Sequence, residues 1–253
     1  MRDVLGLIVG GYERGGTTVI QHILANHPEL DSGFESGLLL APTPIEFLNP
    51  EYHEYNRSLI RHGWGVTEEE LRDYILATDS WSLVYRRLRE KSRVIKDKSA
   101  TLFDKTPRYM AKLADVLERT NYEVPAVIIV RSALSVLGSW IKRLPAAPGD
   151  SQVMDMCVRY NNYAINARRA MEANPDLTLL VQYAEFCESP EQQIKRILDF
   201  IGLDYSAELL EIDPKFGVRG GSVSKSYLTD YEKVLGQKHI EMISAATDGD
   251  TLV

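Results

Sequence analysis

The stretch Val4-Leu-Gly-Leu-Ile-Val9, followed by Gly10-Gly-Tyr-Glu-Arg-Gly-Gly-Thr-Thr18, decides the fold of this chain of 253 residues. An apolar run of this length that ends in glycine is typical of a strand buried on both faces. Residues 17–26 then carry apolar side chains at a helical spacing, and His27-Pro28 is expected to end that helix. The order of strand, glycine-rich loop and helix predicts a loop that cradles a phosphate.

The loop has the Gly-x-x-x-x-Gly spacing of a nucleotide-binding P-loop, from Gly11 to Gly16. Glycines let backbone N–H groups converge on a phosphate, and the helix N-terminus adds unpaired donors and a partial positive charge. The hydroxyls of Thr17 and Thr18 supply further donors, and Arg14 supplies a planar cation. The alternative is an ordinary glycine-rich turn, but the order of the elements favours anion binding.

Strands and helices alternate along the rest of the chain. Strands are predicted at 124–130 and 177–183, with a weaker signal at 94–96. Helices are expected over 109–119, 133–143, 154–173 and 190–201. This alternation implies an α/β fold, a central parallel sheet flanked by helices, of the P-loop nucleotide-binding type. Ligands of such sheets bind beyond the carboxyl ends of the strands.

The length predicts a single domain over residues 1–253, with an aromatic-rich helical insertion at about 37–101. One helix of the insertion is expected to start at Thr67, with Glu70 completing a capping box. Aromatic faces suit sugars, phenols and apolar molecules alike, and core packing accounts for most of these rings. The aromatic residues are Phe47, Tyr52, Tyr55, Trp64, Trp81 and Tyr85.

The composition excludes several classes of function. A net charge of −7 disfavours a nucleic-acid or anionic-membrane surface, although a pocket for a small anion needs only a few cations. No apolar run has the length of a membrane span or the pattern of a signal peptide. Cys157 and Cys187 fit neither a metal site nor a disulfide framework and are interpreted as reduced thiols. We therefore expect a soluble cytoplasmic protein.

A negative feature separates this loop from those of ATP- and GTP-hydrolysing enzymes. Such enzymes need a loop lysine and an aspartate that holds magnesium at the end of another buried strand. Here the loop has no lysine, and the strand at 124–130 is followed by Arg131. This pattern suits an anionic donor that is bound without an obligatory metal, so no metal site is predicted.

At these positions the chain resembles the sulfotransferases that use 3'-phosphoadenosine-5'-phosphosulfate (PAPS), most closely the tyrosylprotein and carbohydrate branches. The loop is similar to their 5'-phosphosulfate motif, Pro-Arg/Lys-Ser-Gly-Thr-Thr, although Glu13 replaces the proline and Gly15 the serine. The matching positions are Arg14, Gly16, Thr17 and Thr18. The resemblance covers residues 5–36, 102–145 and 178–205, and it implies that residues 14–18 hold the phosphosulfate.

The resemblance also implies two catalytic residues. Glu35 falls where those branches have a general base, which takes the proton of the acceptor hydroxyl as that hydroxyl attacks sulfur. Lys105 falls near the bridging oxygen that leaves with the nucleotide, where a cation stabilises developing charge. Lys96 and Lys98 are weaker rivals of Lys105. Without the family match, Glu35 is interpreted as a capping or surface carboxylate.

The segment from Arg131 to Ser139 is similar to the family's 3'-phosphate motif, an arginine with a serine eight residues later. Arg143 falls where the tyrosylprotein branch has a phosphate-binding arginine. One helical turn separates Ser139 from Arg143, so the two are expected to share a face. Taken singly, Ser139 is a weak marker, and Arg143 fits a solvated side chain.

Three further residues are implied to bind the nucleotide. Tyr183 lies in a Tyr-x-Glu segment at a strand end, where ordinary packing is an equal alternative. Arg219 and Lys225 belong to a basic loop that is similar to the family's C-terminal loop, which closes over PAPS. A plain surface loop is the competing interpretation.

The resemblance implies transfer of a sulfuryl group from PAPS to the hydroxyl of a small molecule, lipid or saccharide, with PAP as the second product. A peptide tyrosine is a further acceptor, less favoured in a chain expected to be cytoplasmic. The insertion at 37–101 would shape the acceptor site. The alternatives are a kinase or other nucleoside-triphosphate enzyme with a degenerate loop, and a non-catalytic nucleotide- or anion-binding module.

Overall fold

Parallel strands form the centre of the computed structural model, which describes residues 4–213, 218–219 and 222–247. Within these residues one sheet has five strands in the order β2-β3-β1-β4-β5, and each neighbouring pair is parallel. The expected parallel α/β fold is thereby confirmed. The strands are β1 (Leu5–Gly11), β2 (Leu30–Asp31), β3 (Thr101–Lys105), β4 (Ala126–Val130) and β5 (Thr178–Gln182).

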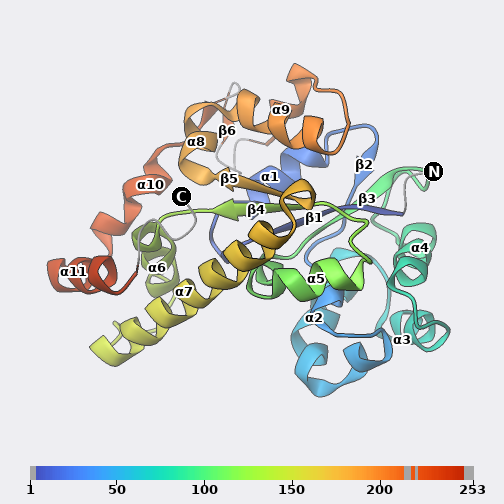
Figure 1. The fold of residues 1–253 in the computed structure, drawn as a ribbon, viewed down its shortest axis with the longest axis horizontal. Coiled ribbons are helices and arrows are strands. Elements are labelled where there is room, and N and C mark those ends of the chain that lie inside the picture. The colour runs from blue at the N-terminus through green and yellow to red at the C-terminus, as the bar shows by residue number, and fades with distance from the viewer. Residues whose placement is uncertain (1–3, 214–217, 220–221, 248–253) are drawn as a thin grey trace.

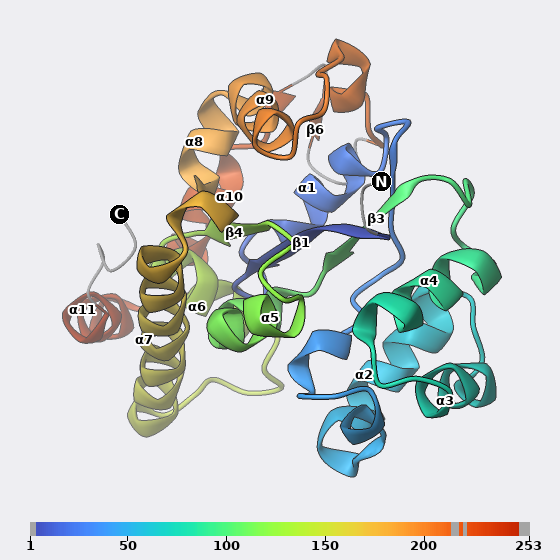
Figure 2. The same cartoon turned by 45° about the vertical axis from the view of Figure 1, so that its right-hand side comes forward.

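Helices cover both faces of the sheet, as Figures 1 and 2 show. One face carries α1 (Thr17–Leu24), α8 (Tyr183–Glu188) and α9 (Pro190–Phe200). The other face carries α5 (Leu113–Arg119), α6 (Ala133–Ile141) and α7 (Asp150–Ala173), with α11 (Gln237–Ala246) packed against α6 and α7. Shorter elements are the antiparallel pair β6 (Val218–Arg219) and β7 (Ser222–Val223), and α10 (Ser226–Thr229).

The alternation of side chains along the strands creates two apolar cores. In β1, Leu7 and Val9 pack on the face of α1 and α9, whereas Ile8 packs on the opposite face with α5 and α7. Cys157 belongs to one core and Cys187 to the other, and both are free and buried. The expectation of two unpaired thiols is therefore confirmed.

Residues 38–91 form a helical layer beside β3. It contains α2 (Pro50–Gly63), α3 (Glu68–Leu76) and α4 (Trp81–Lys91), and 3-10 turns at Leu38–Leu40 and Ile45–Leu48. The predicted capping box is present: Glu70 N–H donates to the Thr67 hydroxyl at 3.1 Å, and Thr67 N–H donates to the Glu70 carboxylate at 2.7 Å. The indole of Trp64 donates to the Phe34 carbonyl, which ties this layer to the loop after β2.

Some boundaries differ from the sequence-based expectations. The predicted strand at 94–96 is wrong, because the carboxylate of Asp31 accepts the amides of Lys96 and Asp97 and holds this segment in turns. The strand lies instead at Thr101–Lys105. The helix expected from 109 begins as a 3-10 helix at Pro107–Lys112, and the strand expected over 177–183 ends at Gln182, where the helix α8 follows it.

Among the described helices, none combines the length and the apolar character that crossing a bilayer requires.

Candidate active site

The loop between β1 and α1 is a tight turn at the carboxyl end of the central strand. Arg14 and Gly16 both adopt left-handed backbone conformations, with φ of 70° and 98°. The amide of Gly15 donates to the Tyr12 carbonyl at 2.8 Å, so it is used inside the loop. The amides of Gly16, Thr17 and Thr18 belong to the start of α1, where N–H groups have no partner within the helix. The predicted anion-binding end of the helix is therefore built from these three residues.

Glycine at position 16 is required by a close approach as well as by its backbone angle. A Cβ placed there would lie 2.2 Å from the ring of Tyr183. Arg131, which follows β4, stacks over the same ring, with its guanidinium carbon 5.2 Å from the ring centroid. Tyr183 therefore contacts the loop and the arginine at once, and its ring fills the space beneath both.

Arg131 and Arg14 meet across the ends of β1 and β4. Arg131 donates to the Arg14 carbonyl at 2.9 Å, and the Nε of Arg14 donates to the Ser139 hydroxyl at 3.3 Å. Burial lowers the pKa of the Arg131 guanidinium, and the nearby charge of Arg14 adds to this effect. A bound anion would offset both, because it stabilises the charged form of each arginine.

These arginines open onto a pocket of about 380 Å³. The pocket brings together Arg131, Ser139 and Arg143, which were predicted to hold the 3'-phosphate, with Arg14, which was predicted to hold the 5'-phosphosulfate. Arg143 lies in the turn after α6 rather than on the helix, because α6 ends at Ile141. The lining of this pocket also includes four residues that the sequence had not indicated: Lys142, Asp230, Tyr231 and Val234.

No described residue of the basic loop that was predicted to close over the nucleotide lines this pocket. Lys225 is exposed just before α10 and does not line it. The side chain of Arg219 lies outside the described part of the structure. The proposed closing loop therefore stays a prediction.

Glu35 and Lys105 form an ion pair at the carboxyl end of β3, the strand next to β1. Lys105 Nζ donates to Glu35 Oε1 at 2.7 Å, and the exposed fractions of the two side chains are 0% and 14%, respectively. Lys105 is the last residue of β3, and its ammonium also lies 4.6 Å from the centroid of the Phe34 ring. Burial lowers the pKa of Lys105, while Glu35 acts in the opposite direction.

The rival lysines do not contact Glu35. Lys98 donates to the carbonyls of Ser92 and Ile95 at 2.5 and 2.8 Å, and Lys96 is exposed. Of the three lysines considered from sequence, Lys105 is thus the one paired with the candidate base.

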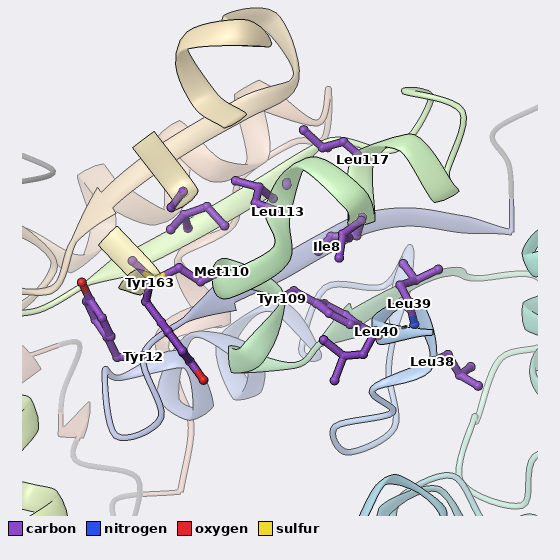
Figure 3. Close-up of a cluster of buried hydrophobic side chains, with 14 of the residues drawn as sticks. Ile8, Tyr12, Leu38, Leu39, Leu40, Tyr109, Met110, Leu113, Leu117 and Tyr163 are labelled. Carbon is purple, nitrogen blue, oxygen red and sulfur yellow. Dashed lines mark hydrogen bonds between the residues drawn. The ribbon is translucent and has the colours of Figure 1, made fainter. Parts of the chain in front are cut away.

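The residue before Lys105, Asp104, is buried and accepts four hydroxyl groups. Its Oδ2 accepts Tyr85 at 2.5 Å, Tyr109 at 2.8 Å and Ser36, and its Oδ1 accepts Thr106 at 3.0 Å. Figure 3 shows Tyr109 directed from the Pro107–Lys112 turn toward Leu39 and Leu40, which follow the loop of Glu35. No motif in the sequence had indicated this network.

Glu13, one of the two residues that depart from the family motif, fixes the other side of the loop. Its carboxylate accepts Arg159 at 2.5 Å and the Tyr163 hydroxyl at 3.2 Å, and its carbonyl accepts the indole of Trp140 at 2.8 Å. Tyr12 stacks on Tyr160 with ring centroids 4.2 Å apart. The loop is therefore attached to both α6 and α7.

A second pocket, of about 590 Å³, lies beside Glu13. Its polar lining has three cations and two carboxylates, and Tyr52, Tyr163, Leu40 and Ala111 add aromatic and apolar surface. The charged residues are Glu13, Glu51, Arg108, Lys112 and Arg159. Leu40, Glu51 and Tyr52 come from the helical layer, and Arg108 lies three residues after Lys105.

Comparison with known proteins gives a family match over most of the chain. The model described as "Sulfotransferase family" matches residues 7–207. A putative protein-tyrosine sulfotransferase of Caenorhabditis briggsae is 26% identical over 210 residues, which are 81% of this chain and 68% of that protein. The chain spans about two thirds or less of the length of the curated relatives it matches.

Solved structures share the fold. The sulfotransferase domain of an olefin synthase from Synechococcus PCC 7002 superposes with a TM-score of 0.66 at 17% identity, covering 95% of this chain and 93% of that one. A mouse sulfotransferase that was solved with PAP gives a TM-score of 0.54 at 10% identity, covering 96% and 83%. Both likenesses concern the arrangement of strands and helices.

Proposed function

The chain belongs to the sulfotransferase family, and from this premise we propose that it moves a sulfuryl group from PAPS to the hydroxyl of a polar acceptor, releasing PAP and a sulfate ester. One observation carries the proposal. The buried ion pair of Glu35 and Lys105 stands at the end of β3, beside the strand whose loop presents a helix N-terminus. A candidate base, a cation and a candidate anion-binding loop thus lie at the carboxyl ends of two adjacent strands, β3 and β1.

The residues at this edge fit the donor. The amides of Gly16, Thr17 and Thr18 and the guanidinium of Arg14 would hold the 5'-phosphosulfate. Arg131, Ser139 and Arg143, which line the 380 Å³ pocket, would hold the 3'-phosphate, and Tyr183 would support Arg131 from below. The lining of this pocket has four cationic side chains, Arg14, Arg131, Lys142 and Arg143, against one carboxylate, Asp230, and this excess of positive charge supports an anionic ligand.

PAPS, when bound, supplies an activated sulfuryl group and a phosphate leaving group. Glu35 then receives the proton of the acceptor hydroxyl, because its carboxylate is the base nearest to the cation that marks the reacting end. Lys105 stabilises the negative charge that develops on the oxygen that leaves. Burial strengthens this effect, since the ammonium is shielded from water.

The acceptor is proposed to enter the 590 Å³ pocket beside Glu13. Its mixture of carboxylates, cations and tyrosine rings favours a polar acceptor with several hydrogen-bonding groups, such as a saccharide, over a lipid. The contribution of Leu40, Glu51 and Tyr52 is the basis for assigning acceptor recognition to the helical insertion. A peptide tyrosine is the second candidate, because the match at 26% identity is named as a putative protein-tyrosine sulfotransferase.

Donor binding separates this proposal from a nucleoside-triphosphate enzyme. We expect PAP to bind in the presence of a chelator, as measured by calorimetry, and ATP with magnesium to bind at least about tenfold more weakly. Preference for ATP with magnesium would contradict the proposal.

Turnover is tested with radiolabelled PAPS and a panel of saccharides, phenols, sterols and tyrosine peptides. Label transfer to a saccharide or another polar alcohol is the expected result. Transfer to peptide tyrosine alone would keep the sulfotransferase reaction and correct the acceptor. Tight PAP binding with no transfer to any hydroxyl would favour the alternative that the protein is a non-catalytic nucleotide-binding module.

A further inference from the structure

We infer that Asp104 is a positioning residue that holds the loop of Glu35 and the end of β3 in register, so that base and cation meet in one geometry. The inference rests on the proposed sulfuryl transfer and adds a residue to which no role has been given. Glu35 and Lys105 are 70 positions apart in the sequence, so a tertiary contact must set their separation. Asp104 and its hydroxyl partners provide that contact.

Three of the four hydroxyls that donate to Asp104 also accept a backbone amide from the segment after Glu35. The amide of Gly37 donates to Thr106 Oγ1 at 3.1 Å, that of Leu38 to Ser36 Oγ at 3.2 Å, and that of Leu39 to the Tyr109 hydroxyl at 3.2 Å. Three consecutive amides are therefore connected to one carboxylate, each through one hydroxyl.

The charge of Asp104 orients the hydroxyl groups that connect it to the backbone amides, which a neutral side chain would not do. A hydroxyl that donates to a carboxylate is oriented, and its oxygen is then presented to the amide as an acceptor. Ser36, Asp104, Thr106 and Tyr109 are all at least 97% buried, so water does not replace these bonds. Gly37 has a φ of 66°, which lets the chain turn so that the amides face inward.

The loop has further restraints that leave Glu35 few other positions. Gln21 donates to the Gly33 carbonyl at 2.7 Å, and the indole of Trp64 donates to the Phe34 carbonyl. Glu35 is thus bracketed by fixed residues on both sides, at 33–34 and at 36–39. A displacement of about 1 Å at a reacting group costs up to about 100-fold in rate. Restraints that hold Glu35 in place are therefore expected to affect kcat.

Asp104 also acts on Lys105 through its charge. Burial lowers the pKa of the ammonium, and the carboxylates of Glu35 and Asp104 both act to raise it. The other titratable groups of the network are Tyr85 and Tyr109, and burial raises their pKa well above the ordinary value, so both stay neutral hydroxyls. Asp104 therefore helps to keep Lys105 protonated at working pH.

The first test is Asp104→Asn, which keeps the size and removes the charge. We expect kcat to fall by about 10- to 100-fold, with PAP affinity within about twofold of the wild type. The alkaline limb of the kcat profile should move to lower pH, because Lys105 loses one of its two carboxylates. In the free protein, NMR titration of the lysine side chains should show the same shift, a readout that does not depend on turnover.

A matched pair of tyrosine variants keeps the test valid if Asp104→Asn does not fold. Tyr85 and Tyr109 both donate to Asp104 Oδ2 and both are buried, but only Tyr109 also accepts the Leu39 amide. Tyr109→Phe should lower kcat at least about tenfold more than Tyr85→Phe, a larger difference than its additional loss of melting temperature, from the unpaired Leu39 amide, accounts for.

Three results would overturn the inference: equal losses of kcat in the two tyrosine variants, a kcat loss that only follows the melting temperature, or an unchanged lysine titration in Asp104→Asn. The proposed function has a separate failure. If wild-type protein transfers no label from PAPS to any acceptor, the reaction is wrong; if it does and Asp104→Asn is equally fast, only the role of Asp104 is wrong.

Discussion

The two halves of the site are built in opposite ways. The proposed donor side, residues 11–18 and 131–143, is shaped by backbone at two adjacent strand ends and by exposed or half-buried arginines. The reaction side, residues 33–39 and 101–109, consists of buried charges and hydroxyls that come from separate segments. The first needs a local conformation, which a short motif can encode. The second needs tertiary contacts, which no short motif contains.

The difference appears in how each half would tolerate change. On the proposed donor side, the conformation of the loop is tightly restricted. Arg14 and Gly16 have left-handed backbone angles, and the ring of Tyr183 leaves no space for a side chain at position 16. On the reaction side, the ion pair of Glu35 and Lys105 depends on Asp104 and on hydroxyls that could be removed one at a time. Substitutions should therefore affect donor binding on one side and turnover on the other.

Glu35→Gln has the largest expected effect and tests that separation directly. Loss of the general base should lower kcat by about 100- to 10,000-fold, while the Kd for PAP stays within about twofold. Steady-state kinetics and calorimetry measure the two quantities. The exposed carboxylate of Glu29, six residues earlier, gives the control Glu29→Gln. Wild-type turnover by Glu35→Gln would remove Glu35 from the mechanism.

Gly16→Ala should be the most destabilising change on the donor side. The left-handed conformation costs about 1–2 kcal/mol for a residue with a Cβ, and the clash with Tyr183 adds about 1–3 kcal/mol. Urea denaturation measures the loss. Gly149→Ala is the control, because a Cβ there meets nothing within 4 Å, and a change of at most about 1 kcal/mol is expected at this N-cap position. Similar losses in both variants would contradict the packing argument.

Arg131→Gln should weaken PAP by about 10- to 100-fold, the size of a charge-assisted hydrogen bond. Adenosine 5'-phosphosulfate lacks the 3'-phosphate, so its affinity should change by less than about threefold. Competition binding compares the two ligands. An equal loss for both would mean that Arg131 supports the loop through Arg14 and does not bind the 3'-phosphate.

The smallest effect is expected on stability, in the double variant Glu35→Gln with Lys105→Met. Replacing a buried ion pair with neutral groups is often neutral or stabilising, so we expect a gain of about 1 kcal/mol at pH 7. The pKa of Lys105 is lowered in the folded protein, so the unfolded chain binds more protons as pH rises toward 10.5. Wild-type stability then increases from this group, and the gain of the variant should shrink between pH 8 and pH 10. A gain that grows over this range would contradict the assigned direction.

The strand, turn and helix at residues 5–24 were predictable from the sequence because a glycine-rich turn between strand and helix has few alternatives. Arg14, Arg131, Ser139 and Arg143 do line one pocket. Lys142, Asp230 and Tyr231 were missed, since the last two approach from a segment about 90 residues away that carries no motif. Of the loop at 219–225, residues 220 and 221 and the side chain of Arg219 fall outside what the structure describes.

The reaction side was predicted only through the family resemblance. Its strand, Thr101–Lys105, carries Asp104 and Lys105, and charged residues argue against a buried strand when they are considered without their partners. The partners are Ser36, Tyr85 and Tyr109, spread over more than 70 residues. A chain pattern cannot show that separate polar residues satisfy one another, so the signal at 94–96 was preferred over the true strand.

The attachment of Trp140 to the loop between β1 and α1 has an optical consequence. Its indole donates to the Glu13 carbonyl at 2.8 Å, and the Arg159 guanidinium lies 4.9 Å from its ring centroid. The chain has three tryptophans, and the other two, Trp64 and Trp81, lie in the helical layer away from this loop. Any nucleotide that reorders residues 13–16 should change the emission of Trp140. The protein thus carries its own fluorescent reporter, and donor association could be followed by stopped flow without a label, with Trp140→Phe as the silent reference.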